Sequence, residues 1–240
     1  LKFFMKSHTR LRINIKSMIN TLEWFAKKNR GGKILFTSSN EAYAGAPEAF
    51  GKLPIPTPEN VPLVISDVYN SRWSYAGTKL IGEQFFIHYA RHYDFRMTIV
   101  RPHNFYGPRA GYDHVIPEFI ARIKKRTDPF PIYGANDTRT FCHIDDAIKA
   151  MDLIMKSRKT DGGIYNIGAS DEIKIKDLAE KLFKLNGWWP KKIEIHPSPK
   201  GSVKRRLADI SKIRKDVGWK PETSLVKGLK ETLNWYWENV

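Results

Sequence analysis

The stretch Lys33-Ile-Leu-Phe-Thr-Ser-Ser39 decides how this chain of 240 residues folds. Its apolar, β-favouring centre stops at small polar residues, which is typical of a buried parallel strand whose carboxyl end opens onto a site. A helix is predicted over 11–28, because apolar residues recur there at helical spacing and Gly31-Gly32 ends the pattern. The segment up to Ser39 is therefore predicted to form a helix and then a buried strand.

The same order follows again further along the chain. A proline-rich loop is predicted over 47–62, a second helix over 74–93 and a second strand over 96–101, closed by Pro102. Helices and strands that alternate through short connections favour right-handed crossovers and a parallel sheet. We therefore predict an α/β fold built on a parallel sheet.

The sequence pattern changes beyond Gly107. Helices are predicted over 116–125, 145–156, 175–185 and 225–237, and strands over 163–167 and 192–196. A stretch rich in proline and glycine, 129–134, lies between the first two of these helices. This half is predicted to form a smaller α/β lobe.

Composition excludes several classes of protein. Apolar residues make up 41% and charged residues 28%, which is the usual globular mixture rather than that of a disordered chain. No apolar run approaches the ~18–20 residues that a membrane span needs, so we expect no membrane partner. The single cysteine, Cys142, permits neither an internal disulfide nor a zinc site built on cysteines, and a reducing, cytoplasmic location is expected.

The net charge of +16 is compatible with nucleic acid, an acidic surface or an anionic small substrate. The basic residues form short runs beside apolar residues, which is typical of solvated helix faces and loop edges. A nucleic-acid binder is an alternative that rests on this charge alone. We predict no nucleic-acid partner.

A phenol and an ammonium are placed together in Tyr75-Ala-Gly-Thr-Lys79. Residues four positions apart share one face of a helix, and a lysine ammonium beside a tyrosine favours the phenolate that a general base needs. Such a pair is common on exposed helices. Thr37-Ser38-Ser39 strengthens it, because crossover geometry brings this strand end beside the helix, where a serine hydroxyl can bond the same substrate oxygen.

Further segments extend this constellation along the chain. The segments are Asn14–Glu23, Phe36–Tyr43, Tyr75–Glu83, Val100–Arg109, Pro131–Gly134, Arg139–Asp146, Tyr165–Gly168 and Asp216–Pro221. In this order they resemble the extended short-chain dehydrogenase/reductase family, and within it the NAD-dependent nucleotide-sugar epimerases and dehydratases. The resemblance implies a doubly wound, Rossmann-like parallel sheet that binds NAD, and a smaller C-terminal lobe that binds a nucleotide-diphosphate sugar.

The resemblance also implies roles for single residues. Tyr75 matches the catalytic base, Lys79 the residue that tunes the base and binds the nicotinamide ribose, and Ser39 the residue that holds the sugar hydroxyl. Glu41 completes the expected catalytic set, because dehydratases and decarboxylases of the family keep a glutamate there. Asn40 stands where glucose-type 4,6-dehydratases carry an acidic proton donor. An amide cannot donate in that way, so dehydration of that type is disfavoured.

Ligand contacts are implied in the same way. Cofactor-binding residues are expected at Thr37, Ser38, Tyr75, Lys79, Pro102 and His103. Substrate-binding residues are expected at Asn104, His114, Tyr133, Arg139 and Arg205. Arginine suits the phosphates because its planar fork pairs with phosphate oxygens. The implied activity is oxidation at sugar C4 to a 4-keto intermediate, followed by epimerisation, loss of water or loss of carboxylate.

The family's Gly-x-x-Gly-x-x-Gly turn, which holds the NAD pyrophosphate, does not occur in the sequence, and Gly31-Gly32 precedes a strand rather than a helix. We therefore expect a truncated Rossmann domain over 1–108. The range 109–240 is expected to be mainly the substrate lobe, with some segments returning to the sheet. A truncated gene product or a lost activity would explain this, and weak or no NAD binding is expected of this segment alone. The alternative function is a catalytically inactive relative that binds a nucleotide sugar or a protein partner.

Other polar residues have plainer interpretations. His143 is expected to be structural, with Asp145-Asp146 as a helix N-cap. The spacing of these residues is not that of a metal site, and no metal is predicted. Glu83 is expected to be a packing or helix-surface residue. Asn14 is either a surface amide or, as in the family, a tie between the Tyr75 helix and the sheet.

The family usually forms homodimers by pairing the Tyr75-bearing helix with the helix before it. A homodimer is therefore expected here. Apolar contacts could come from Leu11, Ile15, Ile19, Phe85 and Tyr89, although one face of each helix must also cover the sheet.

Overall fold

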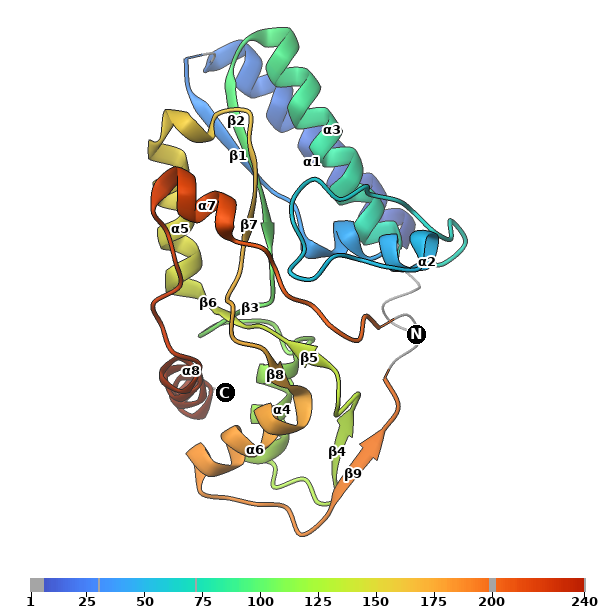
Figure 1. Ribbon diagram of the computed structural model, residues 1–240, viewed down its shortest axis with the longest axis vertical. Coiled ribbons are helices and arrows are strands. Elements are labelled where there is room, and N and C mark those ends of the chain that lie inside the picture. Colours follow the sequence, from blue (N-terminus) through green and yellow to red (C-terminus); the bar gives the residue numbers. More distant parts are fainter. Residues whose placement is uncertain (1–6, 30, 72, 199–201, 240) are drawn as a thin grey trace. The chain divides into compact units, whose positions relative to one another are not determined.

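The structure, a computed structural model, describes residues 7–29, 31–71, 73–198 and 202–239 (Figure 1). The chain forms two compact units. The first comprises Leu1–Pro102, Lys149–Ile167 and Ala208–Trp219, and the second comprises His103–Ile148, Gly168–Leu207 and Lys220–Val240. Two later segments thus return to the first unit.

A parallel sheet forms the centre of the first unit. Its strands are β1 (Lys33–Thr37), β2 (Arg96–Pro102) and β7 (Ile164–Ile167), in the order β1-β2-β7. In the register, Thr37 lies opposite Val100, so β1 and β2 end near each other. The predicted α/β fold with a Rossmann-like parallel sheet is confirmed.

Two long helices, α1 (Ser7–Lys28) and α3 (Trp73–Tyr93), pack against each other beside this sheet (Figure 1). Buried aromatic and aliphatic side chains fill the space between them and the strands. The Phe36 and Phe86 rings stack with their centroids 4.5 Å apart. A Cβ on Gly82 would lie 2.4 Å from Phe36, so glycine is what lets α3 approach the sheet this closely.

Shorter elements complete the first unit. The 3₁₀ helix η1 (Asn40–Tyr43) follows β1, and α2 (Ala46–Phe50) follows η1. The helix α7 (Ser211–Val217) packs on β7, and η2 (Arg158–Thr160) lies just before β7 in the chain. The segment 47–62, predicted to be a loop, therefore begins within a short helix. Proline is compatible with the first turn of a helix, because the N–H that Pro47 lacks would have no partner within the helix there.

The second unit combines three short strand pairs with helices. β3 (Phe105–Tyr106) pairs with β6 (Cys142–His143), and β4 (Phe130–Tyr133) pairs with β9 (Ile193–His196), both in parallel. β5 (Thr138–Arg139) pairs with β8 (Ile173–Lys174) in antiparallel fashion. The helices are α4 (Val115–Lys124), α5 (Ile144–Lys156), α6 (Ile175–Asn186) and α8 (Leu225–Asn239), of which α5 continues into the first unit.

The core of the second unit is aromatic and aliphatic. Phe130 packs edge-on against Phe119 and Phe183, and all three are buried. The stretch 129–134, for which the sequence predicted no strand, contains β4. Its alternate residues Phe130 and Ile132 are buried in this core, as expected of a strand.

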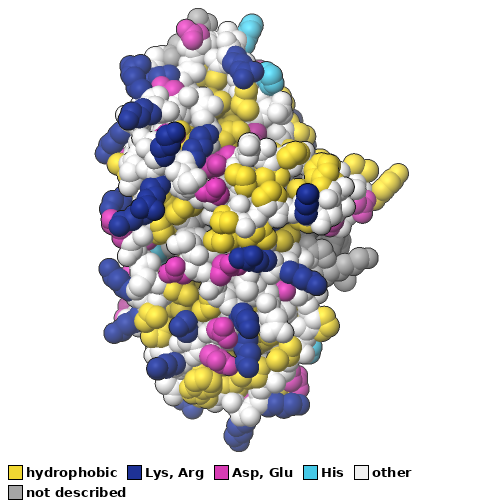
Figure 2. Space-filling model, in the orientation of Figure 1, with side chains coloured by type: hydrophobic (Ala, Val, Ile, Leu, Met, Phe, Trp, Pro, Cys, Tyr) yellow, Lys and Arg dark blue, Asp and Glu magenta, His cyan; other side chains and the backbone are white. Residues whose placement is uncertain are grey.

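Charge is spread over the surface that Figure 2 shows. Lysine and arginine side chains there are interspersed with acidic, apolar and other side chains. In the described ranges, no helix combines the length and the apolar character that crossing a membrane requires.

Candidate active site

Tyr75 and Lys79 lie on successive turns of α3, and both are half-buried. The Lys79 Nζ atom lies 5.5 Å from the centroid of the Tyr75 ring. The same atom donates a hydrogen bond to the carbonyl oxygen of Thr37 at 2.8 Å. Burial lowers the pKa of the Lys79 ammonium below its ordinary value. The structure thus brings the phenol, the ammonium and the end of β1 together.

The segment after β1 carries the predicted serines. The Ser38 hydroxyl donates a hydrogen bond to Glu83 Oε1 at 2.6 Å. Ser39 is the N-cap of η1, and its Oγ accepts a hydrogen bond from the backbone N–H of Glu41 at 3.1 Å. Asn40 is buried and Glu41 half-buried. The cap holds the Ser39 side chain in a defined orientation, and its O–H proton stays available to a further acceptor.

Asn14 connects α1 to the turn of α3 that carries Tyr75. Its Nδ2 donates a hydrogen bond to Thr78 Oγ1 at 3.2 Å, and the Thr78 hydroxyl donates to the carbonyl oxygen of Tyr75 at 2.8 Å. Of the two roles considered for Asn14, the structure favours a tie to the Tyr75 helix. The bond reaches that helix rather than the sheet.

Pro102 and His103, two of the expected cofactor contacts, lie at and just after the end of β2. Pro102 is the last residue of that strand and pairs with Ile167 of β7. His103 comes next and is buried in the second unit. Their cofactor role stays a prediction.

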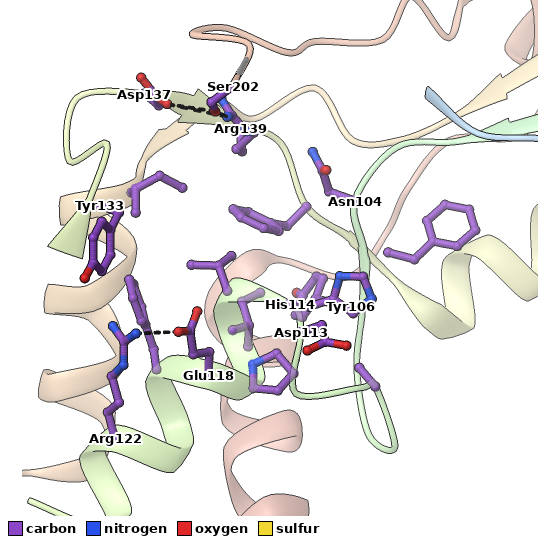
Figure 3. A pocket seen from close by; sticks show the side chains of 18 residues that line it. Asn104, Tyr106, Asp113, His114, Glu118, Arg122, Tyr133, Asp137, Arg139 and Ser202 are labelled. Carbon is purple, nitrogen blue, oxygen red and sulfur yellow. Dashed lines mark hydrogen bonds and ion pairs between the residues drawn. The ribbon is translucent and has the colours of Figure 1, made fainter. Parts of the chain in front are cut away.

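A pocket of about 320 Å³ lies in the second unit (Figure 3). Its lining includes four of the five expected substrate residues, Asn104, His114, Tyr133 and Arg139. Arg205 is not among the lining residues. Its exposed guanidinium instead donates to both carboxylate oxygens of Glu172, which lowers the pKa of that carboxyl.

One end of this pocket carries the Arg139 guanidinium. Arg139 donates to the carbonyl oxygens of Thr138 and Lys204 at 2.8 and 3.2 Å, and to Ser202 Oγ at 3.2 Å. Its guanidinium also lies 3.6 Å from Asp137 Oδ2. In Figure 3 these side chains lie together, away from the Arg122–Glu118 pair on α4. Sequence analysis did not predict Asp137 or Ser202 as site residues. Ser202 is distant from Arg139 in the sequence and reaches it only through the fold.

Tyr133 adds an aromatic surface to the rim of the pocket. Its ring stacks on the His196 ring of β9, with centroids 4.8 Å apart and an interplanar angle of 21°. Tyr133 is 51% exposed, so one face of the stack is open to a planar group. His196 was not predicted as a site residue, and only the register of β4 on β9 places it opposite Tyr133.

His143 and its neighbours differ from their predicted arrangement. The helix α5 begins at Ile144, so Asp145 and Asp146 occupy its first turn and are not an N-cap. Asp146 Oδ2 accepts a hydrogen bond from the Thr223 N–H at 2.9 Å. The buried His143 lies 3.7 Å from Asp145 and 3.6 Å from Glu231 of α8, a neighbour that sequence spacing did not indicate.

Known proteins resemble this chain in sequence. The model of the NAD dependent epimerase/dehydratase family matches residues 5–168. UDP-N-acetyl-alpha-D-glucosaminuronate decarboxylase of Bacillus cytotoxicus is 31% identical over 97% of this chain and 72% of its own length. The putative UDP-glucose 4-epimerase of Methanocaldococcus jannaschii is 33% identical, over 95% of this chain and 70% of its own length.

Solved structures show the same fold. The UDP-glucose 4-epimerase of Thermotoga maritima, determined with UDP-glucose, superposes with a TM-score of 0.84 at 26% identity. The superposition covers 98% of this chain and 72% of that protein.

Proposed function

The chain belongs to the NAD-dependent epimerase/dehydratase family, and from this premise we propose that Tyr75, Lys79 and Ser39 bind and deprotonate the C4 hydroxyl of a nucleotide-diphosphate sugar, whose C4 is oxidised with NAD as the hydride acceptor. An enzyme of the NAD-dependent sugar-nucleotide epimerase/dehydratase type is what its relatives indicate. The observation that carries the residue assignment is the Lys79 ammonium, which is bonded to the end of β1 beside the Tyr75 ring.

The proposed proton transfer begins at Tyr75. Its phenolate takes the proton of the sugar C4 hydroxyl, and the adjacent Lys79 ammonium stabilises the negative charge of the base. Ser39 donates its hydroxyl proton to the substrate oxygen. That proton is free to do so, because Ser39 Oγ only accepts in its capping bond from the Glu41 N–H. Partial burial strengthens the field of Lys79, because less water screens it.

NAD, when bound, would supply the hydride-transfer chemistry at C4. The described residues fit the nicotinamide-ribose side of NAD, because Lys79 and Tyr75 present an ammonium and a hydroxyl beside the end of a parallel strand. Thr37, Ser38, Pro102 and His103 are proposed to line the same side.

The pocket of the second unit is proposed to bind the nucleotide diphosphate. Arg139 would pair with phosphate oxygens, with Asn104 and His114 as further polar contacts on the lining. The open face of Tyr133 suits a nucleobase, which stacks on aromatic rings. Arg205 is retained as a proposed phosphate contact, which would require it to leave Glu172.

The fate of the 4-keto sugar is left open among epimerisation, loss of water and loss of carboxylate. Glu41 supports proton movement at a neighbouring carbon, and a decarboxylase is among the relatives. Asn40 argues against the glucose-type 4,6-dehydration, because an amide is not an acid.

Two further proposals concern the setting of the enzyme. We propose a homodimer through α1 and α3, supported by the exposure of Ile13, Trp24 and Ile81 on these helices, at 55%, 60% and 39%. Leu11, Ile15, Ile19, Phe85 and Tyr89 are half-buried and would contribute their remaining surface. Sedimentation of the protein as a monomer at micromolar concentration would contradict the dimer. A cytoplasmic location is proposed from the single, buried Cys142.

The decisive experiment compares the wild type with Tyr75→Phe, each made as the full-length gene product, because weak or no NAD binding is expected of residues 1–240 alone. With NAD present, UDP-, dTDP-, GDP- and CDP-sugars are screened for product by chromatography, and the variant is measured on whichever sugar reacts. We expect a loss of turnover of about 10²-fold or more, because the base is removed. Near-normal turnover by Tyr75→Phe would exclude Tyr75 as the base. Binding of a nucleotide sugar without turnover of any would favour the inactive relative instead.

A further inference from the structure

A buried ion pair joins α3 to β2 in the first unit. Arg101 Nε donates to Glu83 Oε1 at 2.9 Å, and its terminal nitrogen donates to Glu83 Oε2 at 2.6 Å. The side chains are only 2% and 4% exposed. Burying two charges costs free energy that their attraction barely recovers, so an apolar pair would serve stability as well. The pair therefore calls for a reason other than stability.

The pair holds both ends of the segment that carries Ser39 and Glu41. At the start of the segment, the Ser38 hydroxyl donates to Glu83 Oε1 at 2.6 Å. At its end, another nitrogen of Arg101 donates to the Tyr43 hydroxyl at 2.7 Å. One ion pair thus bonds to residues on both sides of Ser39 and Glu41.

Outer bonds lock this arrangement to its surroundings. The Tyr43 hydroxyl donates to Asn166 Oδ1 of β7 at 2.9 Å, and Arg101 also donates to the Glu59 carbonyl oxygen at 2.8 Å. Glu83 and Arg101 therefore have hydrogen-bond partners in several different elements besides each other. Such a network has one geometry, because each bond constrains the next.

The same pair also fixes α3. Tyr75, Lys79 and Glu83 follow one another at intervals of four residues, so they share one face of that helix. Lys79 bonds to Thr37, and Glu83 bonds to the next residue, Ser38. The helix is thereby attached to two consecutive residues at the end of β1.

We propose that Glu83 and Arg101 are positioning residues, whose ion pair sets the relative placement of Tyr75 and Lys79 on α3 and of Ser39 after β1. The catalytic meaning of this placement rests on the function proposed above. The planar fork of Arg101 is essential to the proposal, because it fixes an angle as well as a distance, whereas a lysine ammonium is a point charge.

The test observes Tyr75 directly by NMR. The chain is made with ¹³Cζ-labelled tyrosine, and Tyr75→Phe identifies one signal among the ten tyrosines. Two variants disturb the pair. Arg101→Lys keeps the charge without the fork, and the double variant Glu83→Gln/Arg101→Met replaces the ion pair with uncharged groups, a change that buried pairs often tolerate.

The matched control is Asp161→Asn, which breaks another largely buried ion pair of the same unit. Lys33 Nζ and Asp161 Oδ1 are 2.7 Å apart, with side chains 3% and 24% exposed, and neither residue belongs to α3 or η1. A general loss of stability would affect this variant too. If the Tyr75 signal moved only because the protein had become less stable, it would move in Asp161→Asn as well.

We expect the Tyr75 signal to move by more than its line width in Arg101→Lys and in the double variant, and to stay in place in Asp161→Asn. Ser38→Ala, which removes one bond to Glu83, should move it less and in the same direction. An unmoved signal in both pair variants would overturn the proposal, as would an equal shift in Asp161→Asn or failure of both pair variants to fold. NAD and sugar are not used, so failure of the proposed function is a separate result.

Discussion

Lys79 Nζ donates its hydrogen bond to the carbonyl oxygen of Thr37, 2.8 Å away, rather than extending into solvent. The lysine side chain is long and flexible, and it loses conformational entropy when it is held in this way. Its ammonium is also partly desolvated, which lowers its pKa. Both effects oppose folding, so the position of this charge is better explained by chemistry than by stability.

Replacement of Lys79 by methionine should therefore separate activity from stability. Lys79→Met keeps the length of the side chain and removes the charge, and Thr37 is exposed, so water can satisfy its carbonyl oxygen. We expect a turnover about 10²-fold lower or worse, with a melting temperature equal to or above that of the wild type. A variant that is both less stable and fully active would contradict this reading. Calorimetry and the product assay give the two values.

Arg139 should control nucleotide affinity. In a thermal-shift titration with UDP, we expect Arg139→Ala to bind about 10- to 100-fold more weakly, because a charge-assisted hydrogen bond to phosphate is lost. Arg91→Ala, an exposed arginine of α3, serves as the control and should match the wild type.

Arg205→Ala belongs in the same titration. Arg205 is paired with Glu172 and, unlike Arg139, does not line the pocket, so its loss should weaken UDP binding less than the loss of Arg139. Equal affinities of the wild type and Arg139→Ala would remove the pocket from the proposed site.

Affinity for NAD can be measured on residues 1–240 alone. The contacts proposed above reach the nicotinamide-ribose side of NAD. Among the described residues, β1 leads into η1 rather than through a glycine-rich turn into a helix. Weak or undetectable binding of NAD is therefore expected in a calorimetric titration. Micromolar affinity would show that the pyrophosphate is held in another way.

Glu59 should make stability depend on pH. Burial raises the pKa of its carboxyl above the ordinary 4.5, and the Asn166 N–H that it accepts only partly offsets this. The folded state then keeps a proton that the unfolded state has lost, so the free energy of unfolding falls as pH rises above 4.5.

Glu59→Gln removes this dependence and keeps an oxygen for the Asn166 N–H. We expect the variant to be at least as stable as the wild type at neutral pH, with the difference shrinking as the pH approaches 4.5. Urea unfolding at several pH values measures it. A variant that loses stability most at neutral pH would mean that the sign is wrong.

Lys33 should contribute more to stability than a surface lysine. Its buried ammonium donates to the carbonyl oxygens of Ile154 and Ser157 at 2.8 Å each and to Thr160 Oγ1 at 2.7 Å, and pairs with Asp161. We expect Lys33→Met to lower the free energy of unfolding by about 3 kcal/mol, since it leaves buried acceptors unpaired.

Lys156→Met is the matched comparison, because Lys156 pairs with Asp152 on an exposed helix surface. Its loss should cost only about 0.3–0.5 kcal/mol. Chemical denaturation of both variants gives the two values, and equal losses would contradict the assigned role of Lys33.

Local patterns in the sequence were enough to predict several features. The helices around 11–28 and 74–93 and the strands after them follow from apolar periodicity, which depends on near neighbours. Tyr75 and Lys79 share a face because they are one helical turn apart, whatever the rest of the chain does. The serines at the end of β1 follow from the strand's abrupt change from apolar to polar residues.

Only the tertiary structure decided which distant groups meet. Arg101 pairs with Glu83, Ser202 reaches Arg139, and His196 stacks on Tyr133, although nothing in their sequence neighbourhood connects them. These contacts depend on strand register and on how helices pack, which are set by the sum of many weak interactions over the whole core. A residue's own sequence neighbours carry no record of that sum, and Glu83 therefore resembled an ordinary helix residue until the fold placed Arg101 against it.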